Sequence, residues 1–221
     1  GDGLHTVNVS TAAALVTAAA GIPVAKHGNR SVSSKTGSAD VLKSLGVKID
    51  LTPEQAQQCL NEVGIAFLFA PVYHSSMKHA VVPRKEMGIR TVFNILGPMS
   101  NPASVKRQVI GAFNLEVAEK MVKVLKQTGS EHILLVHSKD GMDEISISDT
   151  TQVYELKDGN ISSYEISPEQ FGMAVADAER IGMQDIVTWL GGIPENKFEC
   201  AEASSLTLKK AIEKYRAGRS G

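Results

Sequence analysis

The sequence contains little cysteine, few aromatic residues and no long apolar run. Its 221 residues include two cysteines, and aromatic residues make up only 5% of the chain. Cys59 and Cys200 stand alone, without the close spacing of metal-binding thiols, so we expect both to be buried free cysteines. No stretch reaches the roughly 18 uninterrupted apolar residues that a membrane span needs.

The sequence also lacks an excess of charge of either sign. Its formal net charge is −1 and neither half is a basic block, which argues against a protein that coats nucleic acid. The first ten residues, GDGLHTVNVS, contain no basic segment of the signal-peptide type. We therefore predict a cytoplasmic protein.

Apolar strands and helical patterns alternate along most of the chain. The alternation over residues 5–137 predicts an α/β fold with a mixed, largely parallel sheet flanked by helices. Residues 145–167 alternate in steps of two around Asp158-Gly159-Asn160, which is typical of a small antiparallel segment. The pattern weakens near Met173. We expect one α/β domain over residues 1–172, and an extension over 173–221 that packs on it through a terminal helix.

Several elements can be placed from their end signals. A strand is expected over residues 5–10 and a helix over 11–21, followed by a second strand that ends near Gly28. Ser38 is the expected N-cap of a short helix. Thr52 and Gln55 form a capping-box pattern for a helix that stops at Gly64. Further along, residues 65–71 read as a buried strand, residues 77–88 as a helix despite Pro83, and residues 108–138 as a strand–helix–strand crossover.

Polar residues gather where the first predicted strand opens into a helix. Asn8, Ser10 and Thr11 stand at that helix start, where free N–H groups and the helix dipole favour an anion. The alternative is that Ser10 and Thr11 only cap the helix. The segment is therefore a candidate anion site.

The stretch VAKHGNRSVSSKTGSAD, Val24 to Asp40, is dense in groups that bind phosphate. Lys26 and His27 lie at a strand end, where α/β proteins place ligand groups. Gly28 would let the backbone approach a ligand, and Asn29 offers a donor and an acceptor. The hydroxyls that follow end in a second helix start, so we expect two anion sites, as a ligand with two phosphate groups would need. A solvated loop is the alternative for the serines.

Two later segments add a carboxylate pair and a set of cations. Asp143 and Glu144 follow a predicted strand and a Gly turn, and such hard oxygen ligands suit Mg²⁺. A solvated turn is the more frequent explanation for such a pair. Arg84 could present its planar fork to a carboxylate, but spacing alone does not separate it from Lys85 and Arg90. Together the segments resemble the parts of a phosphate cleft.

The longer motifs are similar to those of the anthranilate phosphoribosyltransferases of tryptophan biosynthesis. The resemblance runs in order from residue 1 to about 172, and its most specific parts are KHGNRSVSS and RTVFNILGPMSNP. It implies the α/β catalytic domain of the nucleoside phosphorylase and phosphoribosyltransferase type. It also implies transfer of a phosphoribosyl group from 5-phosphoribosyl-1-pyrophosphate to anthranilate, with Mg²⁺ as cofactor.

The resemblance also assigns roles to individual residues. The phosphoribosyl pyrophosphate would be held by Gly1, Asp2, Asn8, Ser10, Thr11, Lys26 and Ser38. Mg²⁺ would be held by Ser10, Asp143 and Glu144. Anthranilate would contact His27, Asn29 and Arg84, with Arg84 as the main carboxylate partner and Ala70 and Pro71 beside the ring. No residue is assigned as a general acid or base.

The sequence departs from the family's pattern at both ends. It begins at the last three residues of the family's Gly-Thr-Gly-Gly-Asp-Gly loop, and a preceding helical domain of about 70–80 residues is not in the sequence. That domain forms the family's homodimer contact and covers the cleft, so we expect weaker activity and an exposed apolar patch here. The alternatives are a pyrimidine nucleoside phosphorylase-like enzyme and a non-catalytic, nucleic-acid-binding relative.

Overall fold

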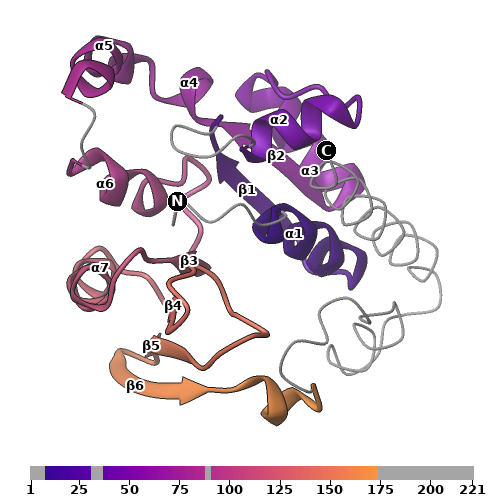
Figure 1. Ribbon diagram of the computed structural model, residues 1–221. Coiled ribbons are helices and arrows are strands. Elements are labelled where there is room, and N and C mark those ends of the chain that lie inside the picture. The colour runs from indigo at the N-terminus through magenta and orange to yellow at the C-terminus, as the bar shows by residue number, and fades with distance from the viewer. Residues whose placement is uncertain (1–7, 31–36, 88–90, 174–221) are drawn as a thin grey trace, which may run out of the picture. The chain divides into compact units, whose positions relative to one another are not determined.

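The computed structural model describes residues 8–30, 37–87 and 91–173, and this part of the chain divides into two units (Figure 1). The first unit runs to Leu68 and the second begins at Phe69. Each is described by itself below. The expected domain boundary near residue 172 and the extension over 173–221 concern residues that lie almost entirely outside the described part.

Within its described residues, the first unit contains three helices and two paired strands. In chain order they are α1 Val9–Ala19, β1 Val24–Gly28, α2 Ser38–Ser44, α3 Pro53–Val63 and β2 Ile65–Phe69, with β1 beside β2. Ala66, Phe67 and Leu68 of β2 are buried, which confirms the predicted buried strand. The strand ends earlier than expected, because Ala70 and Pro71 already belong to the next helix.

The capping signals of α3 are confirmed. The hydroxyl of Thr52 accepts a hydrogen bond from the N–H of Gln55, and the Gln55 side chain accepts one from the N–H of Thr52. The helix ends at Gly64, whose φ of 82° lies in the left-handed region that glycine adopts without strain.

Two other helix starts differ from the prediction by one or more residues. α1 begins at Val9 and Asn8 is its N-cap, so the last residues of the expected strand are helical. Neither Ser10 nor Thr11 caps the helix, because the Asn8 side chain already accepts the N–H of Thr11. Gly37 rather than Ser38 precedes α2, since the Asp40 carboxylate accepts the N–H of Gly37.

The second unit contains four α-helices and a four-stranded sheet within the described residues. Its elements in order are α4 Ala70–Tyr73, η1 Ser75–Met77, α5 Lys78–Met87, α6 Phe93–Met99, β3 Arg107–Gly111, α7 Leu115–Gln127, β4 His132–Ser138, β5 Thr151–Lys157, β6 Asn160–Ile166 and η2 Pro168–Phe171. α5 continues through Pro83, as predicted.

The sheet of the second unit is mixed, with strand order β3-β4-β5-β6. β3 and β4 are parallel and joined through α7, which confirms the crossover unit. β5 pairs antiparallel with both β4 and β6, and the β5–β6 turn places Asp158 and Gly159 at positive φ. The chain therefore has the expected mixed α/β character, although its described strands form two sheets instead of one.

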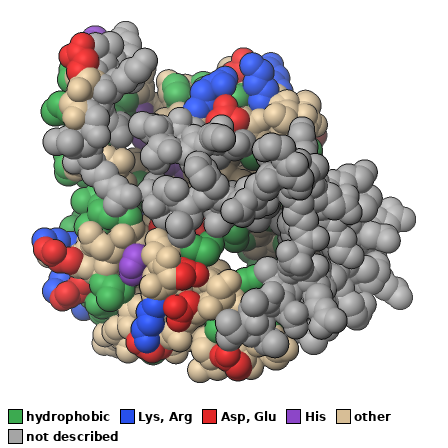
Figure 2. Space-filling model, in the orientation of Figure 1, with side chains coloured by type: hydrophobic (Ala, Val, Ile, Leu, Met, Phe, Trp, Pro, Cys, Tyr) green, Lys and Arg blue, Asp and Glu red, His purple; other side chains and the backbone are tan. Residues whose placement is uncertain are grey.

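The core of the second unit lies between α7 and the sheet. Ala118, Met121, Val122 and Leu125 recur at helical spacing on one side of α7, and all are buried. They pack with apolar residues of β3, β4 and β5, among them Ile110 and the fully buried Leu135 and Leu156. The outer side of α7 carries ion pairs one turn apart, such as Lys120–Glu116 at 2.5 Å. Figure 2 shows charges of both signs interspersed there.

The structure bears on two further expectations from composition. None of the helices within the described ranges is both long and apolar enough to cross a membrane. Cys59, on α3, is a free thiol, but it is only half-buried. Its thiol donates a hydrogen bond to the carbonyl of Ile65. Cys200 lies outside the described residues.

The packing of α7 predicts different effects for two identical substitutions. Val122→Ala should lower the free energy of unfolding by about 2 kcal/mol, because the side chain is fully buried against the sheet. Val124→Ala is the matched control: that side chain is 42% exposed, so its loss should change stability little. Urea unfolding followed by circular dichroism measures both. Equal destabilisation of the two variants would contradict the proposed core.

Candidate functional site

The amino end of α1 is organised by the side chain of Asn8. Its amide oxygen accepts the N–H of Thr11 at 3.0 Å, which fixes the first turn of this 11-residue helix. Thr11 is 3% exposed, and its hydroxyl oxygen has no hydrogen-bond partner within the described part of the chain. A buried polar atom without a partner is costly, so a ligand that supplied one would be favoured here.

Four of the predicted phosphate-binding residues meet around this helix start. The Asn8 amide oxygen also accepts hydrogen bonds from the hydroxyls of Ser10 at 3.4 Å and Ser38 at 3.3 Å. The Lys26 ammonium group donates to the Ser10 hydroxyl at 3.1 Å. We call these residues, Asn8, Ser10, Lys26 and Ser38, the polar cluster. They come from α1, β1 and α2 and are all half-buried, so the fold joins residues that are 30 positions apart.

The polar cluster has the chemistry of an anion site. It combines one cationic side chain with two hydroxyl donors and the positive end of the α1 dipole. The start of α2 is less suited to the second anion site expected from the sequence, because the Asp40 carboxylate already accepts the N–H of Gly37 at 3.0 Å. The Asp40 carboxylate also pairs with the guanidinium of Arg30 at 3.1 Å.

Gly28 lies against the neighbouring strand. A side chain there would lie 2.9 Å from the ring of Phe67, so the glycine makes room for the neighbouring strand. It thereby allows β1 to pack closely on β2, and it also brings the end of β1 near Ser38. This contact accounts for a glycine at the position, and the expected close approach to a ligand stays a prediction.

The residues expected to contact anthranilate are divided between the two units. His27 is half-buried in β1, and the exposed Asn29 accepts the N–H of Arg30 at 2.7 Å through its side chain. Arg84 lies on α5 of the second unit, and its side chain is outside the described part, as are Gly1 and Asp2. Ala70 and Pro71 begin α4. That these residues contact the same anthranilate molecule stays a prediction.

Asp143 and Glu144 lie in a loop, residues 139–150, between β4 and β5 of the second unit. Both are half-buried. The loop is tied to the strand ends: the N–H of Ser138 donates to the carbonyl of Met142 at 2.9 Å, and that of Lys139 donates to the carbonyl of Thr150 at 2.9 Å. The pair is therefore presented from a closed turn at the carboxyl end of β4.

Asp140 organises this loop and was not among the predicted site residues. Its carboxylate accepts the Ser146 hydroxyl at 2.5 Å and the N–H of Met142 at 3.1 Å. Partial burial raises the pKa of Asp140, but these hydrogen bonds outweigh it and leave the pKa below its ordinary value. Asp140 is thus ionised and bound within the loop. The Asp-Gly pair at 140–141 is a turn signal that could have indicated this role.

The carboxylates of this loop suit an Mg²⁺ ion that has few protein ligands better than a metal that is enclosed by protein side chains. Within the described residues no three His, Cys, Asp or Glu side chains gather as a metal site. Mg²⁺ commonly keeps several waters and is held by one or two carboxylates plus substrate phosphates. Asp143 and Glu144 supply such a pair, whereas Ser10, the third predicted ligand, belongs to the first unit.

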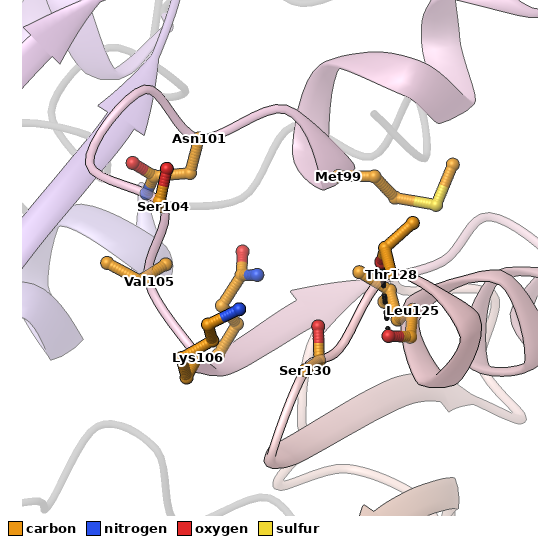
Figure 3. A pocket seen from close by; sticks show the side chains of 9 residues that line it. Met99, Asn101, Ser104, Val105, Lys106, Leu125, Thr128 and Ser130 are labelled. Atoms are coloured by element: carbon orange, nitrogen blue, oxygen red, sulfur yellow. Dashed lines mark hydrogen bonds between the residues drawn. The ribbon is translucent and has the colours of Figure 1, made fainter.

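A hollow of about 210 Å³ lies in the second unit, at the end of the sheet away from the acidic loop. Its lining includes Lys106, Gln108 and Ser130, next to the starts of β3 and β4, and Figure 3 shows Lys106, Thr128 and Ser130 around it. The acidic loop follows the other end of β4. Lys106 lies near the carboxyl end of α7, where a cation complements the helix dipole, so we assign the hollow a structural role.

Comparison with known proteins agrees with these features. Residues 1–213 match the model of a glycosyl transferase family, described as its a/b domain. The chain is 61% identical to an anthranilate phosphoribosyltransferase of Cellvibrio japonicus over 173 residues, which cover 78% of this chain and 50% of that protein. The chain thus spans about half the length of several curated relatives that it matches.

Solved structures show the same relationship. The crystal structure of anthranilate phosphoribosyltransferase from Thermus thermophilus matches with a TM-score of 0.76 and 34% identity, over 98% of this chain and 74% of that one. The enzyme from Saccharomyces cerevisiae, in complex with PRPP and Mg, matches with a TM-score of 0.73 and 25% identity, over 96% and 69%. The chain therefore belongs to the glycosyl transferase family defined by this a/b domain, and its relatives there are anthranilate phosphoribosyltransferases.

Proposed function

We propose that the chain transfers the phosphoribosyl group of 5-phosphoribosyl-1-pyrophosphate to the amine of anthranilate. The products are N-(5-phosphoribosyl)anthranilate and pyrophosphate. The single observation that carries the proposal is the polar cluster, in which Lys26, Ser10 and Ser38 meet at the amino end of α1. The names of the relatives described above support the same reaction, and none of those names supports a nucleoside phosphorylase.

The polar cluster would hold the phosphate-bearing substrate. The hydroxyls of Ser10 and Ser38 are donors that can turn from Asn8 toward phosphate oxygens, and the Lys26 ammonium can turn there from the Ser10 hydroxyl. Thr11 would add its hydroxyl, which lacks a partner within the described residues. Gly1 and Asp2 complete the proposed set, by resemblance to the family.

Mg²⁺ is the proposed cofactor, held by Asp143, Glu144 and Ser10. Support comes from the paired, half-buried carboxylates and from the yeast relative, whose structure is described as a complex with PRPP and Mg. When bound, the ion would neutralise negative charge that develops on the leaving pyrophosphate. Lys26 would act on the same charge. Stabilisation that grows as the bond to C1 of ribose breaks lowers the barrier and does not merely tighten binding.

Anthranilate would be placed by His27, Asn29 and Arg84. The planar guanidinium of Arg84 suits a bidentate contact with the substrate carboxylate. The substrate amine is already a nucleophile, so orientation contributes more than proton removal, and we assign no general base.

The cytoplasmic location, and a homodimer like that of the family, are predictions that rest on resemblance and composition.

The role of Lys26 can be tested by Lys26→Met. We expect kcat to fall about 100-fold, because a charge aimed at the leaving group is lost. Lys43→Met is the matched control, since Lys43 is exposed in the last turn of α2. Loss of anthranilate fluorescence in the presence of phosphoribosyl pyrophosphate and Mg²⁺ measures turnover. Equal activity of Lys26→Met and the wild type would refute the assignment, and a folded wild type that does not consume anthranilate would refute the function.

Asn8→Asp separates helix capping from substrate binding. Aspartate caps helices as well as asparagine, so the melting temperature should hold, but its charge should weaken binding of phosphoribosyl pyrophosphate about tenfold or more. Asn114→Asp is the matched control, because Asn114 caps α7 through a hydrogen bond from Val117. Isothermal titration measures the affinity. If both variants bind like the wild type, the polar cluster does not hold phosphate.

A further inference from the structure

We propose that Gly111, the last residue of β3, is a positioning residue that sets the location of Asp143 and Glu144. The inference rests on the proposed function, because it assumes that these carboxylates hold Mg²⁺. It concerns a residue that touches neither substrate nor metal. Its effect would pass through the backbone of the loop between β4 and β5.

The contact between Gly111 and the loop is one of backbone against backbone. A Cβ atom built on Gly111 would overlap the carbonyl oxygen of Asp143 and would lie 2.8 Å from its carbonyl carbon. Real Cβ atoms do not approach other heavy atoms so closely, so one of the two must move. Because the overlapping atoms of Asp143 belong to the main chain, a rotamer change of that residue cannot relieve the overlap.

The strand side of this contact is held by the sheet. Gly111 pairs with Val136 in the parallel ladder, and the next residue, Ala112, donates its N–H to the Val136 carbonyl at 2.9 Å. The Ala112 carbonyl accepts a hydrogen bond from the Nδ1–H of His137 at 2.9 Å, and Ala112 is 1% exposed. Gly111 therefore stays in the sheet, and an added methyl group would displace the loop.

The loop leaves Asp143 and Glu144 between two fixed points. Met142 is bound to Ser138 and Asp140, and Ser146 is bound to Asp140 and to the Thr151 hydroxyl at 3.0 Å. A displacement of the Asp143 main chain would therefore shift Asp143 and its neighbour Glu144 relative to these points. Mg²⁺ demands ligands at about 2.0–2.1 Å in near-octahedral geometry, so a small shift of both carboxylates would weaken its binding.

Gly111 differs from Gly28 and Gly97 in what an added side chain would meet, because only at Gly111 is it a main-chain atom. Its φ lies outside the left-handed region, so alanine would meet no backbone strain there and the overlap alone would act. A side chain at Gly28 would meet the ring of Phe67, and one at Gly97 in α6 would meet nothing within 4 Å. Gly97, also outside the left-handed region, is thus a matched control for the same substitution.

The experiment compares Gly111→Ala with Gly97→Ala and the wild type in the full chain. The first readout is binding of Mn²⁺ in the presence of phosphoribosyl pyrophosphate, followed by electron paramagnetic resonance. We expect the apparent Kd for Mn²⁺ to rise tenfold or more in Gly111→Ala and to hold in Gly97→Ala. The second readout is hydrogen exchange at residues 142–146, which should become faster only in Gly111→Ala.

Kinetics separate positioning from a general structural effect. Gly111→Ala should require at least tenfold more Mg²⁺ for half-maximal rate, while KM for anthranilate at saturating Mg²⁺ stays unchanged. Equal rises in both quantities, or unchanged exchange at residues 142–146, would overturn the inference.

A second pair of variants covers the case in which Gly111→Ala unfolds. Ser146→Ala removes the hydroxyl that ties Asp140, so the loop can yield. We expect Gly111→Ala to destabilise the Ser146→Ala protein less than it destabilises the wild type. Equal destabilisation in the two backgrounds would place the strain in the sheet and overturn the inference.

The proposed metal site is tested apart from Gly111 by Asp143→Asn and Glu144→Gln. Wild-type Mn²⁺ binding that neither substitution weakens would refute the metal role of the pair, and with it the reason to assign Gly111 a functional part. Faster loop exchange in Gly111→Ala would then report a structural contact only. The two failures therefore have different signatures.

Discussion

The parallel pairing of β3 and β4 is the constraint on which the second unit depends. A parallel pair requires a crossover, and α7 supplies it by burying Ala118, Val122 and Leu125 against the sheet. The crossover brings the carboxyl ends of both strands to one edge, so Gly111 and the loop that carries Asp143 lie next to each other in space. Core packing and the acidic loop are thus two results of one topology.

Much of the fold could be predicted from the sequence where the signals are local. The capping box of Thr52, the stop at Gly64 and the Asp158-Gly159 turn are set by neighbouring residues, and all are confirmed. The starts of α1 and α2 differ from the prediction. Asn8 and Asp40 accept the backbone N–H groups there, and the sequence pattern alone does not show which side chain accepts which N–H. Choosing between competing donors and acceptors requires geometry.

The candidate site was predictable in its residues but not in its connections. The density of phosphate-binding groups pointed to Lys26 and Ser38. Their hydrogen-bonded connection through Ser10 and Asn8 joins three elements, and the spacing of these residues in the sequence does not indicate it. Gly28 is a second example: the sequence shows a glycine beside ligand groups, but its packing against Phe67 becomes visible only in the structure. Both outcomes depend on partners that are distant in sequence, which local patterns do not encode.

The arrangement around Asn8 also explains how such a site can be formed before its ligand binds. One amide oxygen accepts a backbone N–H and two hydroxyls, at 3.0, 3.4 and 3.3 Å, so the two hydroxyl contacts are long and easily given up. Phosphate oxygens could take over the Ser10 and Ser38 hydroxyls by rotation alone, while the N–H of Thr11 keeps Asn8 in place. Little backbone ordering would then accompany binding, which leaves more of the interaction energy for affinity.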